Sequence, residues 1–461
     1  MPERATIDRV TIDRARLAQL HGRELASFRA ARPRSAALAE RARAHLPGGV
    51  PMCWMVKWPG EFPVFVEQAA GAHFTCVDGI DHIDLCLGDT GAMMGHSPAP
   101  TVEAVTAQLA RGITTMLPTE DAIAVSTGLS ERFGLPYWQF TLTATDANRH
   151  AIRYARHLTG RPTIVVHNHC YHGSVDETFA TLDDAGRTAN RRNSIGPPVD
   201  TSETTRVVEF NDVDGLEKAL AEGDVAAILV EPALTNIGIV LPDDGYNEAV
   251  RELATKHGVL LINDETHTIC AGPGGITRRD NLHPDLLVIG KSIGGGVPCG
   301  TFGFTQDVAD RITRSVELED IDVGGIGGTL AGNGLSMAAM RATLEHVMTQ
   351  GAFDGMIPLA DAWADGVQAG IDAAGAPWHV TRLGARAEYN FAPEPPRNGQ
   401  EAHAADDFEL QQYLHLYALN RGILLTPFHN MALMSPATTR ADVTAHTAMF
   451  DECVRELFSQ P

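Results

Sequence analysis

The feature that most constrains the fold is an alternation of short apolar runs with helical patterns between about residues 98 and 330. Parallel strands need long crossover connections, which are usually helices, so this alternation predicts a mostly parallel sheet flanked by helices. The expected strands are 139–142, 163–166, 225–230, 259–262 and 286–289, and the helices between them include 145–158, 215–221 and 245–257.

The region beyond residue 333 predicts a smaller C-terminal lobe, and the region before residue 98 is expected to be helical at first and then rich in strands. The expected elements are helices at 12–44, 334–347, 406–420 and 440–458, strands at 64–66, 82–87, 379–381 and 387–391, and a loop at 392–406. A chain of 461 residues is long enough for two or three lobes. We expect an N-terminal segment 1–75 that joins the small domain, a large domain 76–333, and a C-terminal small domain 334–461.

Composition excludes several classes of function. The net charge of −22 argues against a nucleic-acid or anionic-membrane partner. No apolar stretch has the length of a membrane span, and the charged N-terminus lacks the apolar core of a signal peptide, so a cytoplasmic location is expected. The seven cysteines are scattered without a CxxC pair, so we expect reduced, mainly buried thiols.

Two expected strands end in residues that can carry chemistry. The run 259–262 leads into Asp264, and the run 286–289 leads into Lys291 and a glycine-rich loop. Open sheets of this kind bind ligands at the carboxyl ends of their strands. A lysine that can form a Schiff base and an acid that can hold a pyridine nitrogen protonated are the requirements of pyridoxal phosphate (PLP) chemistry. Taken singly, each residue also fits a solvated loop lysine or a helix N-cap.

Two further segments follow strands. Small and hydroxyl residues at 143–148 open a helix, where free backbone N–H groups can bind a phosphate. The segment 167–174 carries three histidines and a cysteine, a composition that suggests a metal site. An extended segment would point them in different directions and no distal ligand pair is present, so we expect no metal. We expect Tyr171 or His172 to stack against an aromatic cofactor instead.

An ordered set of motifs resembles the class III, fold-type I PLP enzymes, which include ω-aminotransferases and glutamate-1-semialdehyde aminomutases. The resemblance covers about residues 40–450 and rests on Tyr171-His172-Gly173, Glu231-Pro232, Asp264-Glu265, Lys291 with its glycine loop, 328–333, 151–156 and 159–161. It implies a large domain with a mostly parallel seven-stranded sheet flanked by helices, and a smaller α+β domain built from both termini.

The resemblance also implies roles. Lys291 would form the Schiff base and move the proton, and Asp264 would pair with the pyridine nitrogen. A homodimer with shared active sites follows, since Thr329 would reach the phosphate of the neighbouring subunit. The other cofactor-binding residues expected are Thr143, Ala144, Thr145, Tyr171, His172 and Glu231.

Four departures from the family pattern indicate changed substrate recognition. The phosphate loop is Thr-Ala-Thr-Asp-Ala at 143–147, and Glu265 is followed by Thr-His-Thr-Ile-Cys in place of an apolar residue and Thr-Gly-Phe-Arg. The segment 51–58 lacks the arginine of the aminomutase Ser-Pro-Val-Arg element, and Asp89-Thr90-Gly91 replaces a common aromatic residue.

Candidates for substrate binding lie outside the strand-end motifs. Arg386 could hold a carboxylate through a bidentate contact, although a surface arginine on a strand edge fits as well. Trp54 and Lys57 could line the pocket or simply pack the lobe, and His429 lies in a loop expected to form part of the pocket.

We predict an aminotransferase that moves an amino group from an amino acid or amine to a keto acid by a ping-pong mechanism. The rival is a glutamate-1-semialdehyde-type 2,1-aminomutase, disfavoured by the missing arginine; a racemase or decarboxylase remains open. A nucleotide-binding protein is weaker, because position 285 is Asp where a P-loop needs Gly, and 324–328 lacks a strand–turn–helix context. A non-catalytic protein that retains the scaffold is the remaining alternative.

Overall fold

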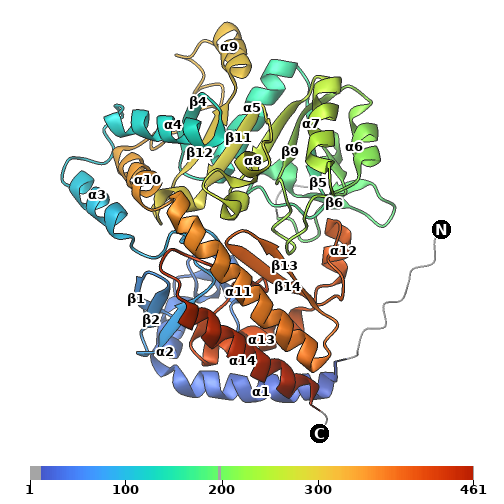
Figure 1. Ribbon diagram of the computed structural model, residues 1–461. Coiled ribbons are helices and arrows are strands. Elements are labelled where there is room, and N and C mark those ends of the chain that lie inside the picture. Colours follow the sequence, from blue (N-terminus) through green and yellow to red (C-terminus); the bar gives the residue numbers. More distant parts are fainter. Residues whose placement is uncertain (1–11, 196–198, 460–461) are drawn as a thin grey trace.

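The computed structural model describes residues 12–195 and 199–459. A seven-stranded sheet occupies the upper half of the molecule (Figure 1). Every neighbouring pair is parallel except those of β12, which runs antiparallel to both β11 and β4. The strands, in sheet order, are β4 (Tyr137–Thr141), β12 (Gly300–Phe304), β11 (Leu286–Gly290), β10 (Leu260–Asp264), β9 (Val225–Val230), β5 (Thr163–His167) and β8 (Thr205–Val208).

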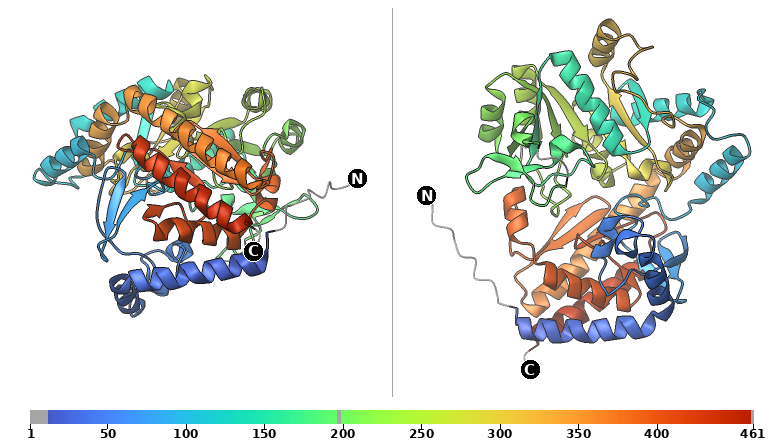
Figure 2. Two further views of the ribbon diagram at one scale, coloured as in Figure 1. Left: turned by 60° about the horizontal axis from the view of Figure 1, so that its bottom comes forward. Right: turned by 180° about the vertical axis from the view of Figure 1, so that it is seen from behind.

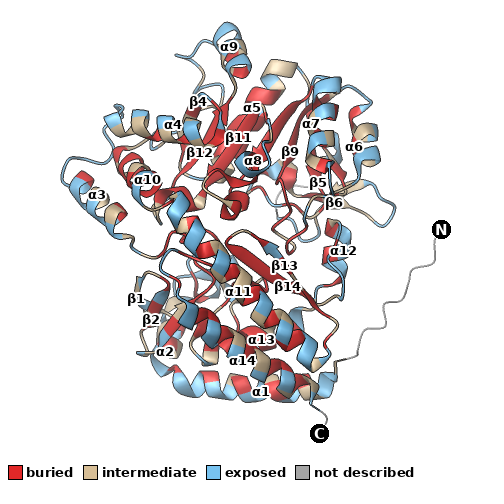
Figure 3. Ribbon diagram, in the orientation of Figure 1, coloured by how far each residue is buried: buried red, intermediate tan, exposed pale blue. Residues whose placement is uncertain are grey.

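Both faces of this sheet are covered. Along β11, Leu287 and Ile289 enter one apolar core, while Leu286 and Val288 enter the other. Successive side chains of a strand point to opposite faces, so a strand buried at every position needs a packed layer on each side. Figure 3 shows the buried strands between helices with exposed outer surfaces. The helices around the sheet are α3 (Ala99–Leu109), α4 (Glu120–Phe133), α5 (Ala144–Thr159), α6 (Val213–Leu220), α7 (Tyr246–His257), α8 (Gly275–Arg279), α9 (Gln306–Ser315) and α10 (Gly334–His346).

The other half of the molecule is built from both ends of the chain (Figure 2). Its first sheet joins N-terminal strands to a C-terminal one, because β15 pairs in parallel with β3. Its strands are β1 (Val66–Ala70), β2 (His73–Cys76), β3 (Asp81–Asp84), β13 (His379–Leu383), β14 (Arg386–Asn390), β15 (Ile423–Leu424) and β16 (Met431–Leu433). Its helices are α1 (Arg14–Ala31), α2 (Pro33–Arg43), α11 (Gln350–Ala374), α12 (Gly399–Ala404), α13 (Phe408–Asn420) and α14 (Arg440–Phe458). In the other half, a separate hairpin beside the large sheet consists of β6 (Ala180–Leu182) and β7 (Thr188–Asn190).

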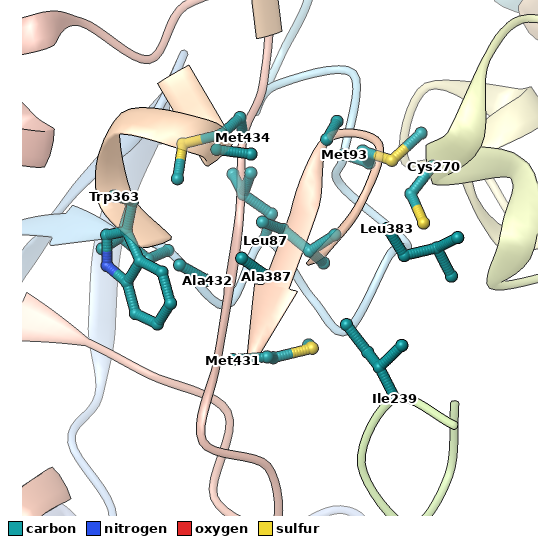
Figure 4. Packing of buried hydrophobic residues seen from close by; sticks show 14 of the residues in the cluster. Leu87, Met93, Ile239, Cys270, Trp363, Leu383, Ala387, Met431, Ala432 and Met434 are labelled. Carbon is teal, nitrogen blue, oxygen red and sulfur yellow. The ribbon is translucent and has the colours of Figure 1, made fainter. Parts of the chain in front are cut away.

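One apolar core connects the two halves. In Figure 4, Trp363 and Met431 from the C-terminal half lie in the same packed group as Cys270 and Ile239, which belong to the half with the large sheet. The strand-end residues are therefore held against the smaller half by continuous packing.

The fold class expected from the sequence is confirmed: a mostly parallel seven-stranded sheet flanked by helices, with a smaller α+β part. Three local expectations are wrong. The helix expected at 12–44 is broken at Arg32, because the following Pro33 cannot continue it. The expected loop 392–406 contains α12. The strand expected at 82–87 ends at Asp84, since a left-handed turn begins at Leu87.

Two further observations concern the exposure of the cysteines and the hydrophobicity of the helices. Cys53 is exposed and the other six cysteines are buried, as expected for most of them. Across the described parts of the chain, no helix is long and apolar enough to cross a membrane.

Candidate active site

A cavity of about 530 Å³ opens where β10 and β11 end. Asp264 is the last residue of β10 and Lys291 immediately follows β11, and both line this cavity. The structure thus brings together the two residues that the strand-end argument singled out. Parallel neighbours deliver their carboxyl ends to the same edge of a sheet, which explains the placement.

Asp264 is a buried carboxylate fixed by three donors. Its Oδ2 accepts from Asn148 Nδ2 at 2.8 Å and from His172 Nδ1 at 2.9 Å, and its Oδ1 accepts from the Thr266 backbone N–H at 3.1 Å. Burial raises the pKa of Asp264, but these hydrogen bonds and the His172 charge together lower it below the ordinary value. The group is therefore ionised and faces the cavity as an acceptor.

His172 lies behind this carboxylate rather than in the cavity. Burial disfavours its charged form, yet the neighbouring Cys170 and Asp264 raise the pKa of His172 to about 10. The imidazolium and the carboxylate form a buried ion pair at 2.9 Å. Of the two rings proposed for stacking, Tyr171 lines the cavity and is 39% exposed, whereas His172 supports Asp264.

Glu231 supports the Tyr171 segment from behind. Its Oε1 accepts from the Tyr171 backbone N–H at 3.3 Å, and its Oε2 accepts from the Thr235 backbone N–H at 3.2 Å. Burial is the main cause of its raised pKa. Glu231 does not line the cavity, so its cofactor-binding role stays a prediction, and its visible contact is with the loop that carries the aromatic ring.

The start of α5 forms one wall of the cavity. Thr143 is the N-cap and accepts from the Asp146 N–H at 3.2 Å, which leaves the first N–H groups of the helix at the cavity. Thr143, Ala144 and Thr145 all line the cavity. The Ser174 N–H donates to Thr145 Oγ1 at 3.1 Å, which ties the Tyr171 loop to this helix end.

Gly173 makes that close approach possible. Its φ is +77°, and a Cβ at this position would lie 2.1 Å from Thr145 Oγ1. Gly290 has a similar role on the opposite side, where a Cβ would lie 3.1 Å from the Ala144 nitrogen. The helix start, the aromatic loop and the strand ends therefore enclose a space that fits a flat ring with a phosphate at one end.

Lys291 is held by groups that the sequence did not connect with it. Its Nζ donates to Asp89 Oδ2 at 2.9 Å, to the Asp89 carbonyl at 3.0 Å, and to His267 Nε2 at 2.8 Å. Burial and the Lys291 charge lower the pKa of His267 to about 3, so the imidazole is neutral. With Nε2 accepting, its Nδ1–H donates to Thr90 Oγ1 at 3.0 Å.

The other histidines of segment 167–174 point in different directions. His167 meets Tyr246 Oη at 2.8 Å, and the His169 ring stacks on His403 with centroids 4.7 Å apart. Among residues 12–195 and 199–459, no group of three or more His, Cys, Asp or Glu side chains is arranged to hold a metal ion.

Thr329 lies in a second cavity, of about 770 Å³, together with Arg153 and Asn333. It does not line the cavity of Lys291 in its own chain. The role implied for it therefore needs a neighbouring subunit and stays a prediction.

Arg386 is completely buried, so the alternative of a surface arginine is wrong. It lies on β14, the central strand of its sheet, and its Nη2 donates to Glu388 Oε2 at 2.8 Å and to the Thr235 carbonyl at 2.9 Å. Its Nε and Nη1 have no hydrogen-bond partner in the described structure. Arg386 does not line the Lys291 cavity, although its charge helps to lower the pKa of Asp89.

The remaining substrate candidates are His429 and two residues that pack against its neighbour Phe428. His429 Nδ1 lies 3.2 Å from Glu388 Oε1. Trp54 packs edge-on against Phe428 with centroids 5.9 Å apart, and Lys57 Nζ lies 5.5 Å from the centre of the same ring. None of these three candidates lines the Lys291 cavity, so their role in substrate binding stays a prediction.

The fold, with a lysine and an acid that line one cavity at neighbouring strand ends, defines a fold-type I PLP enzyme. The model of the family described as aminotransferase class-III matches residues 55–454, and the chain belongs to this family. The predicted cofactor, pyridoxal phosphate, is confirmed with it.

Relatives and solved structures extend this similarity over nearly the whole chain. Glutamate-1-semialdehyde 2,1-aminomutase of Anaeromyxobacter dehalogenans (strain 2CP-C) is 33% identical over 89% of this chain and 95% of its own length. A crystal structure of a glutamate-1-semialdehyde aminomutase from Pseudomonas aeruginosa PAO1 is 49% identical, with a TM-score of 0.95 over 97% of this chain and 99% of that one. An ω-transaminase from Sphaerobacter thermophilus is 28% identical, with a TM-score of 0.83 over 92% and 98%.

Proposed function

We propose that this chain is a PLP-dependent enzyme that moves an amino group within one substrate molecule, in the manner of a glutamate-1-semialdehyde 2,1-aminomutase. The observation that carries the amino-group chemistry is the placement of Lys291 and Asp264 in one cavity beside the start of α5. Similarity to aminomutases over nearly the full length supports the intramolecular reaction over the ping-pong transfer that the sequence analysis favoured.

Five residues and the start of α5 have tasks in this reaction. When bound, the cofactor supplies an electron sink that makes a proton next to the reacting nitrogen acidic. The ionised Asp264 would accept a hydrogen bond from the ring nitrogen, and Asn148 and His172 keep its carboxylate oriented. Lys291 would supply the amine that attaches the cofactor and, when neutral, would move the proton. Tyr171 would pack against the ring, and the α5 N–H groups would bind the phosphate.

An intermolecular aminotransferase is the second candidate, and one observation favours it. The segment 51–58 lacks the arginine that the aminomutase pattern uses for the substrate carboxylate, and its only cation, Lys57, lies against Phe428. In either reaction we assign the carboxylate contact to Arg386, whose Nε and Nη1 are buried without partners.

We propose in addition a homodimer in which Thr329 serves the neighbour's cofactor. Apolar side chains lie exposed in the same cavity wall as Thr329, with Met116 at 78% and Leu117 at 72%. A second subunit would remove this apolar surface from water. Light scattering on the purified holoenzyme tests this, and a monomer at micromolar concentration would contradict it.

The two reactions are separated by the need for an acceptor. The pyridoxamine-phosphate form is incubated with glutamate 1-semialdehyde alone, or with glutamate and a panel of keto acids. Formation of the amino-shifted isomer without any acceptor is the expected result. Amino transfer to an added keto acid, with no isomer formed, would refute the aminomutase and support the aminotransferase.

A further inference from the structure

The amine of Lys291 contacts three acceptors in the described structure. Its Nζ lies 2.9 Å from Asp89 Oδ2, 3.0 Å from the Asp89 carbonyl and 2.8 Å from His267 Nε2. A lysine ammonium has three N–H donors and no acceptor, so these contacts match the protonated amine. In the proposed reaction Lys291 acts as a nucleophile and as a base, and both tasks need a nitrogen with a free electron pair. One of the three hydrogens must therefore leave first.

His267 is the acceptor best suited to take this proton. The Asp89 carbonyl accepts hydrogen bonds but is not a base at neutral pH. Burial raises the pKa of Asp89, but the charge of Lys291 holds it well below its ordinary value, so this carboxylate is a weak base. An imidazole nitrogen is the usual side-chain group for accepting a proton near neutral pH. The side chain of His267 also lines the cavity, whereas that of Asp89 does not.

Thr90 keeps the His267 ring in the tautomer that can accept. Since Nε2 accepts from Lys291, Nδ1 carries the ring hydrogen and donates it to Thr90 Oγ1 at 3.0 Å. Thr90 is fully buried and has a φ of +80°, a strained value for a β-branched residue. Strain of this kind persists only where surrounding contacts hold it, and it is concentrated at functional sites. The electron pair of Nε2 is thus held towards the amine.

Transfer of the proton leaves the net charge of this cluster unchanged. The Nζ–H bond breaks, its electron pair stays on Nζ, and an N–H bond forms at Nε2, so the positive charge passes to the imidazole. Asp89 Oδ2 lies 3.9 Å from Nε2 and faces the new cation. Burial and the Lys291 charge lower the pKa of His267, and the second cause disappears once the lysine is neutral. The other cations that act on His267 are Arg386 and His429.

We propose that His267 is a catalytic residue that accepts a proton from Lys291 and so frees the electron pair with which the lysine attaches the cofactor. This inference rests on the proposed function for the role of Lys291. His267 belongs to the Thr-His-Thr-Ile-Cys run after Glu265, where the chain departs from the family pattern.

Cofactor attachment to the full-length apoprotein tests this without any substrate. The protein is mixed rapidly with pyridoxal phosphate, the rate constant comes from the growth of visible absorption, and borohydride trapping with mass spectrometry confirms Lys291 as the site. His267→Gln keeps a hydrogen-bond acceptor but cannot take a proton, so attachment should slow about 10²-fold, the lower end of general acid–base effects. His346→Gln, a substitution at an exposed position on α10, should attach at the wild-type rate.

Two further measurements distinguish proton transfer from a structural role. Imidazole added to His267→Ala should restore the attachment rate in proportion to its concentration, because it supplies the missing base. Thr90→Ser should attach near the wild-type rate, whereas Thr90→Val, which has no hydroxyl, should be slowed.

Equal attachment rates in wild type and His267→Gln would overturn the proposal, as would a slow His267→Ala variant that imidazole does not accelerate. If the His267 variants do not fold, equal rates in Thr90→Val and Thr90→Ser overturn it on their own. Failure of the proposed function has a different signature. The wild type would then attach the cofactor at Lys291, at a rate that depends on His267, but would neither isomerise nor transaminate a substrate.

Discussion

Replacing Gly173 with alanine should loosen the cofactor site without unfolding the protein. The new Cβ would lie 2.1 Å from Thr145 Oγ1 and 3.0 Å from its Cα, so rotating the threonine side chain cannot relieve the clash. The Tyr171 loop or the start of α5 must then move, and the 3.1 Å bond from the Ser174 N–H to Thr145 is lost.

The magnitude follows from two costs. An alanine at φ +77° costs about 1–2 kcal/mol relative to glycine. Overpacking adds about 1–3 kcal/mol, and this second cost falls on the loop and helix end that hold the cofactor. Since 1.4 kcal/mol corresponds to a factor of ten, we expect the dissociation constant for pyridoxal phosphate to rise about 5- to 150-fold.

Gly160→Ala is the matched control, at the other end of α5. Gly160 also has a positive φ, +67°, but no atom lies within 4 Å of its added Cβ. The Gly160→Ala variant should lose about 1–2 kcal/mol of unfolding free energy and keep wild-type cofactor affinity. Titration of the two apoproteins with cofactor, followed by absorbance, measures the two dissociation constants, and urea unfolding measures the loss of stability. Wild-type cofactor affinity in Gly173→Ala, or an equal loss of cofactor affinity in both variants, would refute the reasoning.

Three more predictions follow from the buried charges. Asp264→Asn should retain the cofactor at its phosphate end but lower kcat by about 10²–10⁴-fold, and an unchanged kcat in the loaded variant would contradict this. His172 has a pKa raised from 6.5 to about 10, so its stabilisation is complete below pH 6.5 and lost as pH rises towards 10. Urea unfolding should therefore show the gap between wild type and His172→Gln shrinking over this range, and a constant gap would refute the ion pair. Arg386→Met should cost about 3–5 kcal/mol of unfolding free energy, because the buried Glu388 carboxylate loses its guanidinium partner and keeps only the His429 contact. Arg386→Met/Glu388→Leu should recover much of this loss, and a double variant no more stable than the single one would argue against this account.

The large sheet was predictable because most of its strands are buried on both faces and appear as continuous apolar runs. The exceptions are β8, a short edge strand that contains Arg206, and β12, where Gly300 and Gly303 obscure the strand pattern. A Cβ at Gly300 would lie 2.4 Å from the Thr143 carbonyl, and one at Gly303 would lie 2.7 Å from the Trp138 ring. Both glycines serve close packing between strands, which a single-sequence pattern does not reveal.

The helix α11 was missed for a related reason. Pro358 and several glycines interrupt its sequence pattern, yet a Cβ at Gly366 would lie 2.5 Å from Thr447 of α14. Small residues there allow two helices to pack closely, and tertiary packing outweighs the low helix propensity of glycine.

In the site, too, some residues could be predicted from the sequence, whereas the contacts between distant residues could not. Lys291 and Asp264 could be predicted because each follows an apolar strand at the same edge of the sheet. Asn148 and His267 could not be assigned their contacts, since the partners are 116 and 24 residues away in the chain. The replacement of an aromatic residue by Asp89 was visible in the sequence, but its pairing with Lys291 required the fold.

The central claim is that the ε-amino group of Lys291 forms the covalent bond to pyridoxal phosphate. Borohydride reduction of the holoenzyme followed by peptide mass spectrometry tests it directly. We predict a single reduced pyridoxyl-phosphate adduct on Lys291, with loss of the visible absorption band, and no adduct in Lys291→Ala. A stable adduct on another lysine, or an active Lys291→Ala enzyme, would contradict it.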